Sequence, residues 1–230
     1  MSDCVLGICD GSGFVIDEVA DTASPCRCRD QLINRRKARS LSAVIPKRYA
    51  EVSFDRNPVA VMPEAVVRPV RSFVRGLDAQ LDAGRGLWLF GDVGTGKTTL
   101  AMLVSKAALE AGRSVAIYSL PRLLNEIRRT YDEGSDSSYV QLLDKLAEVD
   151  LLHVDDLGTE KSSPWVLEQL YAIVNARYEG QRSMIVTTNL DREELVEQIS
   201  ERTVSRLEEM CDVIPVYGAD HRQVVGRRAS

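Results

Sequence analysis

Two hydrophobic patterns alternate along most of the chain. Short, nearly continuous apolar runs predict buried strands, and longer stretches with helical periodicity predict amphipathic helices. The strands are expected at residues 87–90, 114–118, 151–155, 183–187 and 213–216. The helices are expected at residues 63–83, 99–110, 120–131, 138–148, 164–178, 193–199 and 202–211. Because strands alternate with helices, we expect an α/β fold with a parallel central sheet flanked by helices on both faces.

The first 60 residues lack this alternation. Residues 1–30 carry four cysteines and one short apolar run, at 14–16, which is too little for a core of their own. The basic stretch 29–41 is compatible with a helix, whereas the prolines of 45–58 favour an extended linker. We therefore predict a small N-terminal module at 1–43, a linker at 44–60 and an α/β domain at 61–230.

The most specific motif follows the first strand of the predicted sheet. Residues 91–98 read G-D-V-G-T-G-K-T and fit G-x-x-x-x-G-K-[ST], the phosphate-binding loop of NTPases, in the required strand–loop–helix context. Glycines let the backbone approach a phosphate chain, whose charge then faces the N-terminus of a helix. Lys97 is expected to reach the β- and γ-phosphates, and the Thr98 hydroxyl to hold Mg²⁺. The predicted nucleotide-binding residues are Gly91, Asp92, Val93, Gly94, Thr95, Gly96, Lys97, Thr98 and Thr99. The linker at 44–60 is expected to contribute to the same pocket.

Polar residues at the tips of two later strands suit the rest of such a site. Asp155 is placed to hold Mg²⁺, and Asp156 could orient or deprotonate the attacking water. Asn189 could hold the same water, because an amide both donates and accepts hydrogen bonds. The alternatives are that the two acids cap a strand-to-turn junction and that Asn189 caps the helix starting near Asp191.

Three arginines near the C-terminus are candidates for contacts with phosphates. Arg202 and Arg206 share one face of a predicted helix, and Arg222 lies beyond the last predicted strand. Planar guanidinium groups suit the phosphoryl oxygens of a transition state. Each arginine could instead be a solvated surface residue.

The cysteines cluster near the N-terminus. In a reducing compartment, Cys4, Cys9, Cys26 and Cys28 indicate a metal site rather than disulfides. Four thiolates can close a tetrahedral Zn²⁺ site, which would stabilise a segment that has little core. A site with three cysteines, or none with metal, is the alternative, and Cys211 is expected to be a core thiol.

Residues 45–225 resemble the AAA+ ATPase domain of bacterial replicative helicase loaders of the DnaC/DnaI type and of the related IstB-like transposition helper ATPases. The matching stretches are residues 45–54, 91–100, 151–158, 187–190, 201–207 and 218–222. This resemblance implies an AAA+ P-loop NTPase fold in which Arg206 is an arginine finger acting on the ATP of a neighbouring subunit. It also implies that Asn189 is the first sensor and Arg222 the second, which contacts ATP in its own subunit. Asp156 replaces the Glu that is usual in ATPases of this kind.

The cysteine segment also resembles the zinc modules of the loaders, with one departure. Those modules usually carry Cys-x2-Cys, which would place the first cysteine at Leu6, whereas this chain has Cys4. The basic residues 27–39 would suit an acidic groove on a partner, which the resemblance names as the replicative helicase. They could instead be a solvated face or bind nucleic-acid phosphates.

Two groups of residues are candidates for contacts with single-stranded DNA, because aromatic rings stack on bases and cations follow phosphates. They are Arg128 and Arg129 with Tyr131, and Lys161 and Ser163 with Trp165. The alternative is that Trp165 packs on a neighbouring helix. The net charge of −5 argues against strong non-specific binding to duplex DNA.

We therefore predict an ATPase, with ATP, Mg²⁺ and Zn²⁺ as cofactors, that loads the replicative DNA helicase onto single-stranded DNA during replication initiation. The resemblance implies self-assembly into a ring or spiral, hexameric on the helicase. A transposition helper ATPase and a non-hydrolysing, ATP-switched adaptor are the alternatives, and the cysteine module favours the loader. The chain has no apolar run near 18 residues and no signal-peptide pattern, so a soluble cytoplasmic protein is expected.

Overall fold

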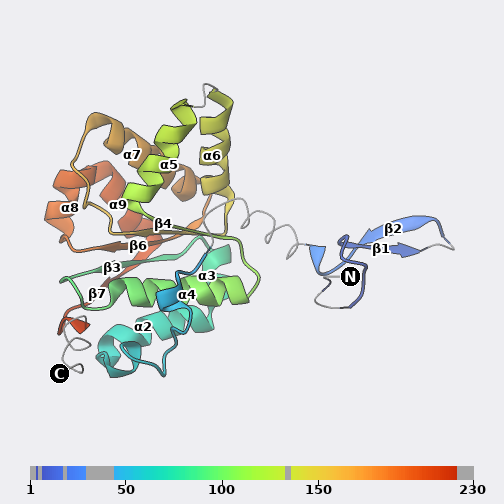
Figure 1. Cartoon of the computed structure of the whole chain (residues 1–230), viewed down its shortest axis with the longest axis horizontal. Helices are drawn as coiled ribbons and strands as arrows, with labels where there is room; N and C mark the ends of the chain where they lie inside the picture. Colours follow the sequence, from blue (N-terminus) through green and yellow to red (C-terminus); the bar gives the residue numbers. More distant parts are fainter. Residues whose placement is uncertain (1–3, 5–6, 18–19, 30–43, 133–135, 222–230) are drawn as a thin grey trace.

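The computed structural model describes residues 4, 7–17, 20–29, 44–132 and 136–221 (Figure 1). Its centre is a parallel sheet of five strands in the order β4-β5-β6-β3-β7. The strands are β3 (Gly86–Phe90), β4 (Val115–Ser119), β5 (Leu151–Asp155), β6 (Ser183–Thr188) and β7 (Cys211–Pro215). Burial is nearly continuous in β3, β4, β5 and β6, which explains their unbroken apolar runs, because both faces of the sheet are covered there, whereas the edge strand β7 is partly exposed.

Helices cover the sheet in two layers (Figure 1). One layer holds α2 (Glu64–Arg75), α3 (Leu77–Asp82) and α4 (Lys97–Glu110). The other holds α5 (Leu120–Asp132), α6 (Asp136–Glu148), α7 (Pro164–Glu179), α8 (Arg192–Ile199) and α9 (Glu201–Met210). Strand alternation divides the core accordingly, since Trp88 of β3 packs in one cluster while its neighbours Leu87 and Leu89 pack in the other.

The order of the strands confirms the α/β prediction, and the expected elements are present with small shifts at their ends. One predicted helix is wrong, because residues 63–83 form two helices separated at Gly76, where a residue of low helix propensity interrupts them. The predicted boundary between the last helix and strand also moves. Cys211 belongs to β7, where it pairs with Gly86 of β3.

The linker prediction needs a similar correction. Residues 45–58 are not extended throughout, because Lys47–Tyr49 form the 3-10 helix η1, and a second short helix, η2, follows at Val59–Val61. Pro46 precedes η1, and its carbonyl accepts a hydrogen bond of 2.8 Å from the Tyr49 N–H. Proline stops a helix that precedes it, but its fixed φ suits a helix start.

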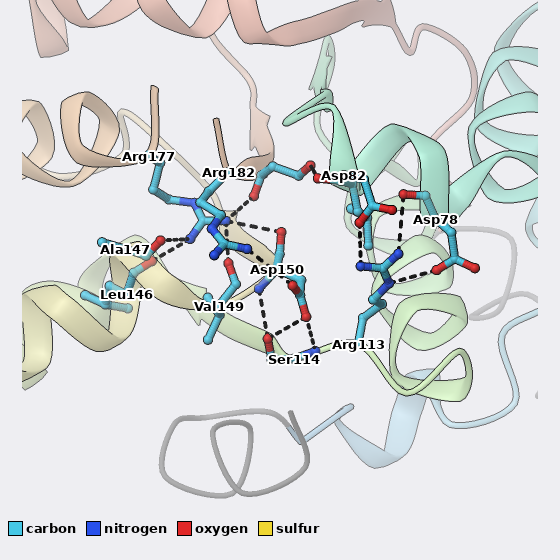
Figure 2. A network of polar contacts seen from close by, with 12 residues as sticks. Asp78, Asp82, Arg113, Ser114, Leu146, Ala147, Val149, Asp150, Arg177 and Arg182 are labelled. Atoms are coloured by element: carbon cyan, nitrogen blue, oxygen red, sulfur yellow. Dashed lines mark hydrogen bonds and ion pairs between the residues drawn. The ribbon is translucent and has the colours of Figure 1, made fainter. Parts of the chain in front are cut away.

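A buried arginine holds the N-terminal ends of two strands in place (Figure 2). Arg177 of α7 is fully buried, and its guanidinium donates to the carbonyls of Leu146, Val149 and Ser183 at 2.6, 2.9 and 2.6 Å. Burial lowers the pKa of Arg177 to about 9, so the group remains charged at neutral pH. These bonds fasten the end of α6 to the starts of β5 and β6. The opposite ends of the same strands carry the candidate site.

Candidate functional site

The phosphate-binding loop connects β3 to α4, as the motif predicts. Gly94 and Gly96 have φ of +82° and +97°, a region that favours glycine. A side chain at Gly94 would overlap Asp220, and one at Gly96 would overlap Met62. Lys97 is buried, and its Nζ donates to the carbonyls of Gly91 and Asp92 at 2.7 and 2.6 Å. The Lys97 side chain therefore folds back on the backbone of its own loop, and its ammonium group lies close to where a phosphate held by the loop would be.

Asp155 joins this loop to the middle of the sheet. Its Oδ1 accepts a hydrogen bond of 2.9 Å from the Thr98 hydroxyl, although the two residues are 57 positions apart. The same oxygen accepts a bond of 2.6 Å from the Thr187 hydroxyl on β6. The two residues predicted to hold Mg²⁺ are thus in direct contact, and a carboxylate beside a hydroxyl is a suitable oxygen ligand set for that ion.

The charge state of Asp155 is set by opposing effects. Burial acts to raise its pKa, while the His153 ring and the Thr187 and Thr98 hydroxyls act to lower it, and the net pKa lies below the usual value. The His153 Nε2 is 3.9 Å from Asp155 Oδ1, so the ring acts at a distance longer than a hydrogen bond. Asp155 is therefore ionised at neutral pH, as a ligand of a divalent cation must be.

Asp156 and Asn189 lie on the same side of the loop. Asp156 has a φ of +58°, which is uncommon for a residue with a side chain, and its N–H donates to Thr187 Oγ1 at 2.9 Å. Asn189 is exposed and does not cap the next helix. Asp191 does so instead, in a capping box with Glu194, which removes the alternative reading of Asn189.

A cavity of about 1050 Å³ brings these groups together. Lys97, Thr98, Asp156 and Asn189 line it, together with Gly94 and Gly96 of the loop. The linker also lines the cavity, although we did not predict its individual residues, and so does Val61 of η2. The linker residues are Arg48, Tyr49, Glu51, Val52, Arg56, Asn57 and Pro58. The cavity has the size, the cationic group and the apolar surface that suit a nucleoside triphosphate.

Thr187 and His153 are site residues whose roles sequence reasoning missed. Thr187 bonds Asp155 and also the N–H of Asp156, so one hydroxyl organises both acids. His153 is fully buried beneath them, with its Nδ1 3.0 Å from the Ser105 hydroxyl of α4. A polar residue in an otherwise apolar strand was the available signal for His153.

The C-terminal arginines occupy a different place. Arg206 of α9 lies beside Tyr171 and Tyr178 of α7, and neither it nor Arg202 is among the described residues that line the cavity. Arg222, predicted as the second sensor, lies outside the described residues. Its neighbour His221 does line the cavity.

The two candidate DNA-binding groups form one surface. The Arg128 guanidinium lies 4.8 Å from the ring centroid of Trp165, and the Tyr131 ring is 6.5 Å from the same indole. Trp165 is half-buried and packs against the core, as its alternative reading held. Ser163 accepts a bond from the Val166 N–H as the N-cap of α7. Arg129 and Lys161, the remaining candidates, are exposed.

The four N-terminal cysteines also converge. The Sγ atoms of Cys4, Cys9, Cys26 and Cys28 all lie within 4.8 Å of one another, and three of these residues are buried. In a tetrahedral zinc site with Zn–S bonds of about 2.3 Å, the sulfurs are about 3.8 Å apart. The cluster therefore has the donor set and spacing of such a site, Cys4 included. Burial and the neighbouring thiols raise the pKa of Cys28, so a bound cation would have to displace protons.

Cys211 behaves differently. It is buried in β7 apart from the cluster, and burial raises its pKa to about 12. This thiol is part of the core, as predicted, and is protonated at neutral pH.

Comparison with known proteins identifies the family. The model of the IstB-like ATP binding protein family matches residues 33–229. The chain belongs to this family. Among curated relatives, the replicative helicase loader DnaC of Escherichia coli (strain K12) is 32% identical over 117 residues. That alignment covers 51% of this chain and 47% of the relative, so the chain spans about half the length of the curated relatives it matches.

Solved structures share this fold. A crystal structure of the DnaC helicase loader has a TM-score of 0.66 and 28% identity, covering 75% of this chain and all of that chain (100%). A DnaI structure has a TM-score of 0.56 and 22% identity, covering 82% of this chain and 93% of that one. The initiator DnaA bound to AMPPCP and single-stranded DNA has a TM-score of 0.61 at 18% identity, covering 80% of this chain and 55% of that one, which shows a shared fold alone. The AAA+ fold and the resemblance to helicase loaders are thereby confirmed. Among the residues described here, no helix could span a bilayer.

The geometry of the loop predicts that Lys97→Ala abolishes nucleotide binding. We expect no measurable affinity for Mg²⁺–ATP, because a buried cation next to the phosphates is lost. Isothermal titration calorimetry measures this directly. Lys145→Ala, on the exposed surface of α6, is the control and should bind like the unaltered protein. Equal affinity in both variants would disprove the assignment of the loop.

The cysteine cluster predicts one Zn²⁺ per chain, measurable by elemental analysis of the purified protein. Cys26→Ser should lose the metal, and Cys211→Ser, outside the cluster, should keep it. Zinc should also dissociate as the pH falls, because protons compete for the thiolates. A Cys4→Ser variant with full zinc would remove Cys4 from the ligand set, and a zinc-free native protein would contradict the site.

Proposed function

We propose that this protein hydrolyses ATP to load the replicative DNA helicase onto single-stranded DNA during replication initiation. The meeting of Thr98, Asp155 and Thr187 beside the phosphate loop is the observation that carries the ATPase part of this proposal. The likeness to DnaC and the N-terminal cysteine cluster support the loader part.

The residues around the cavity suit phosphoryl transfer. Lys97 would contact the β- and γ-phosphates, and Thr98 and Asp155 would hold Mg²⁺, which neutralises phosphate charge when bound. Asn189 would orient a water towards the γ-phosphorus, and the Asp156 carboxylate would take its proton as the bond to the bridging oxygen of ADP breaks. The backbone of Asp156 supports this role, because its N–H is tied to the Thr187 hydroxyl that also bonds Asp155. Arg222 would contact the same nucleotide.

Hydrolysis would be completed between subunits. Arg206 lies away from the cavity of its own chain, so its guanidinium would act on ATP held by a neighbouring copy in a ring or spiral. A cation at that position would stabilise the charge of the transition state.

The surface that contains Arg128 and Trp165 would contact single-stranded DNA. Arg128 is exposed and Trp165 half-buried, and Trp165 lies near both the Arg128 guanidinium and the exposed ring of Tyr131. Cations and aromatic rings on one surface suit a strand with unpaired bases.

The N-terminal module would contact the helicase. Its hairpin consists of β1 (Phe14–Asp17) and β2 (Thr22–Pro25). Val15 packs against the cysteine cluster, so strand alternation places Phe14 and Ile16 on the other face, where Ile16 is 66% exposed. The Arg29 guanidinium lies 4.5 Å from the Phe14 ring centroid, which adds positive charge to this apolar surface. Most of the basic stretch 27–39 lies outside the described residues.

A transposition helper ATPase is the second candidate, because the matching family model is named for IstB-like proteins. The two functions differ in the partner, which is a replicative helicase in one case and a transposase in the other. They share the nucleotide site.

The role of Arg206 predicts rescue between two inactive variants. Arg206→Ala should bind ATP and hydrolyse it poorly, while Lys97→Ala should bind none. Mixing them should restore turnover, measured as phosphate release, because one chain supplies the nucleotide and the other the arginine. No recovery under conditions where the chains assemble would contradict hydrolysis between subunits.

The hairpin surface predicts that Ile16→Asp weakens binding to the replicative helicase at least about tenfold, because a charge replaces an apolar contact. Val140→Asp, at a 52% exposed position on α6, is the matched control and should bind normally. Biolayer interferometry with the purified helicase measures both variants. Equal binding would remove the hairpin from the interface, and capture of a transposase in place of helicase would favour the second candidate.

A further inference from the structure

Two tyrosines of α7 lie against one arginine of α9. Tyr171 and Tyr178 are about two helical turns apart, so they share a face of α7. The Arg206 Cζ is 5.0 Å from the Tyr171 ring centroid and 5.5 Å from that of Tyr178. These distances are those of cation–π contacts.

Tyr171 makes the closer set of contacts. Its hydroxyl accepts a hydrogen bond of 3.3 Å from Arg206 Nη2, and Arg206 Nη1 donates to the Arg202 carbonyl at 3.2 Å. The Arg202 guanidinium also lies over the Tyr171 ring, at 5.6 Å. The ring and the hydroxyl of one residue therefore restrict where the Arg206 guanidinium can lie.

The partners of Arg206 differ from those of the arginines nearby. Arg192 of α8 forms ion pairs with Glu201 and Glu208 of α9, and Arg85 forms one with Asp212. No described carboxylate lies within ion-pair distance of Arg206. An acid would neutralise this guanidinium and compete with phosphoryl oxygens, whereas an aromatic face holds the group without cancelling its charge.

We propose that Tyr171 is a positioning residue that holds the Arg206 guanidinium, charged and restricted in its rotamers, for the phosphates of ATP in an adjoining copy of this chain. This inference rests on the proposed function, in which Arg206 acts between subunits. Its physical basis is that a group ordered before it meets the reacting phosphate loses less entropy when it does.

The test introduces a Tyr171 substitution into only one of the two variant chains of a mixture at a time. In the mixture of Lys97→Ala and Arg206→Ala proteins, only the Lys97→Ala chain supplies the arginine. Tyr171→Leu keeps apolar bulk against α9 but removes the ring. On the arginine-supplying chain it should lower the recovered turnover about fivefold, since a cation–π contact is lost. On the nucleotide-holding chain, Tyr171→Leu should leave the recovered turnover unchanged. On the arginine-supplying chain, Tyr171→Phe should keep most of the recovered turnover, because it keeps the ring.

Each outcome decides a different point. An equal loss with either placement, or a large fall in melting temperature, would show that Tyr171 only packs α7 on α9. Recovered turnover that is insensitive to Tyr171→Leu on the arginine-supplying chain would overturn the inference and leave the role of Arg206 intact. No recovered turnover in the mixture without any Tyr171 change would overturn the role of Arg206 between subunits and the inference with it.

Discussion

Two hydroxyl groups donate hydrogen bonds to a single carboxylate oxygen, Oδ1 of Asp155, and the geometry of the site depends on this contact. Thr98 belongs to the helix that follows the phosphate loop, and Thr187 belongs to β6. The contact is possible because β6 lies between β3 and β5, so that the ends of all three strands meet at one edge of the sheet. The contact also keeps a buried acid ionised, which a divalent cation requires.

Contacts at the opposite edge of the sheet, where the strands begin, stabilise the strands that carry the site. The Arg177 guanidinium bonds the carbonyls where α6 ends and where β5 and β6 begin. Just before the neighbouring strand β4, Arg113 bonds Asp78 and Asp82 of α3, both at 2.7 Å (Figure 2). The hydrogen bonds and ion pairs of these two arginines join the elements where no chemistry is expected. The other edge can then hold strained backbone, such as Asp156, beside the cavity.

The N-terminal module has little apolar core to stabilise it. Its described apolar contacts centre on thiols rather than on a layer of side chains, and several of its larger apolar groups are exposed. A small segment of this kind needs a metal ion or a partner to gain stability that its core does not supply. The same deficit leaves Phe14 and Ile16 available for contacts outside the module. In the proposed function, stability and helicase binding would therefore be linked in this part of the chain.

The sequence by itself determined the class of fold, the phosphate loop, the acids at the strand tip and the cysteine set. These features are local, because period, motif and strand-end position are all properties of neighbouring residues. Only the tertiary structure decided that Thr187 serves both acids and which residues of the linker line the cavity. It alone joined Arg128 to Trp165 and set Arg206 against Tyr171. Each of these contacts joins residues far apart in the chain, and strand order and helix packing, which no local pattern encodes, bring them together.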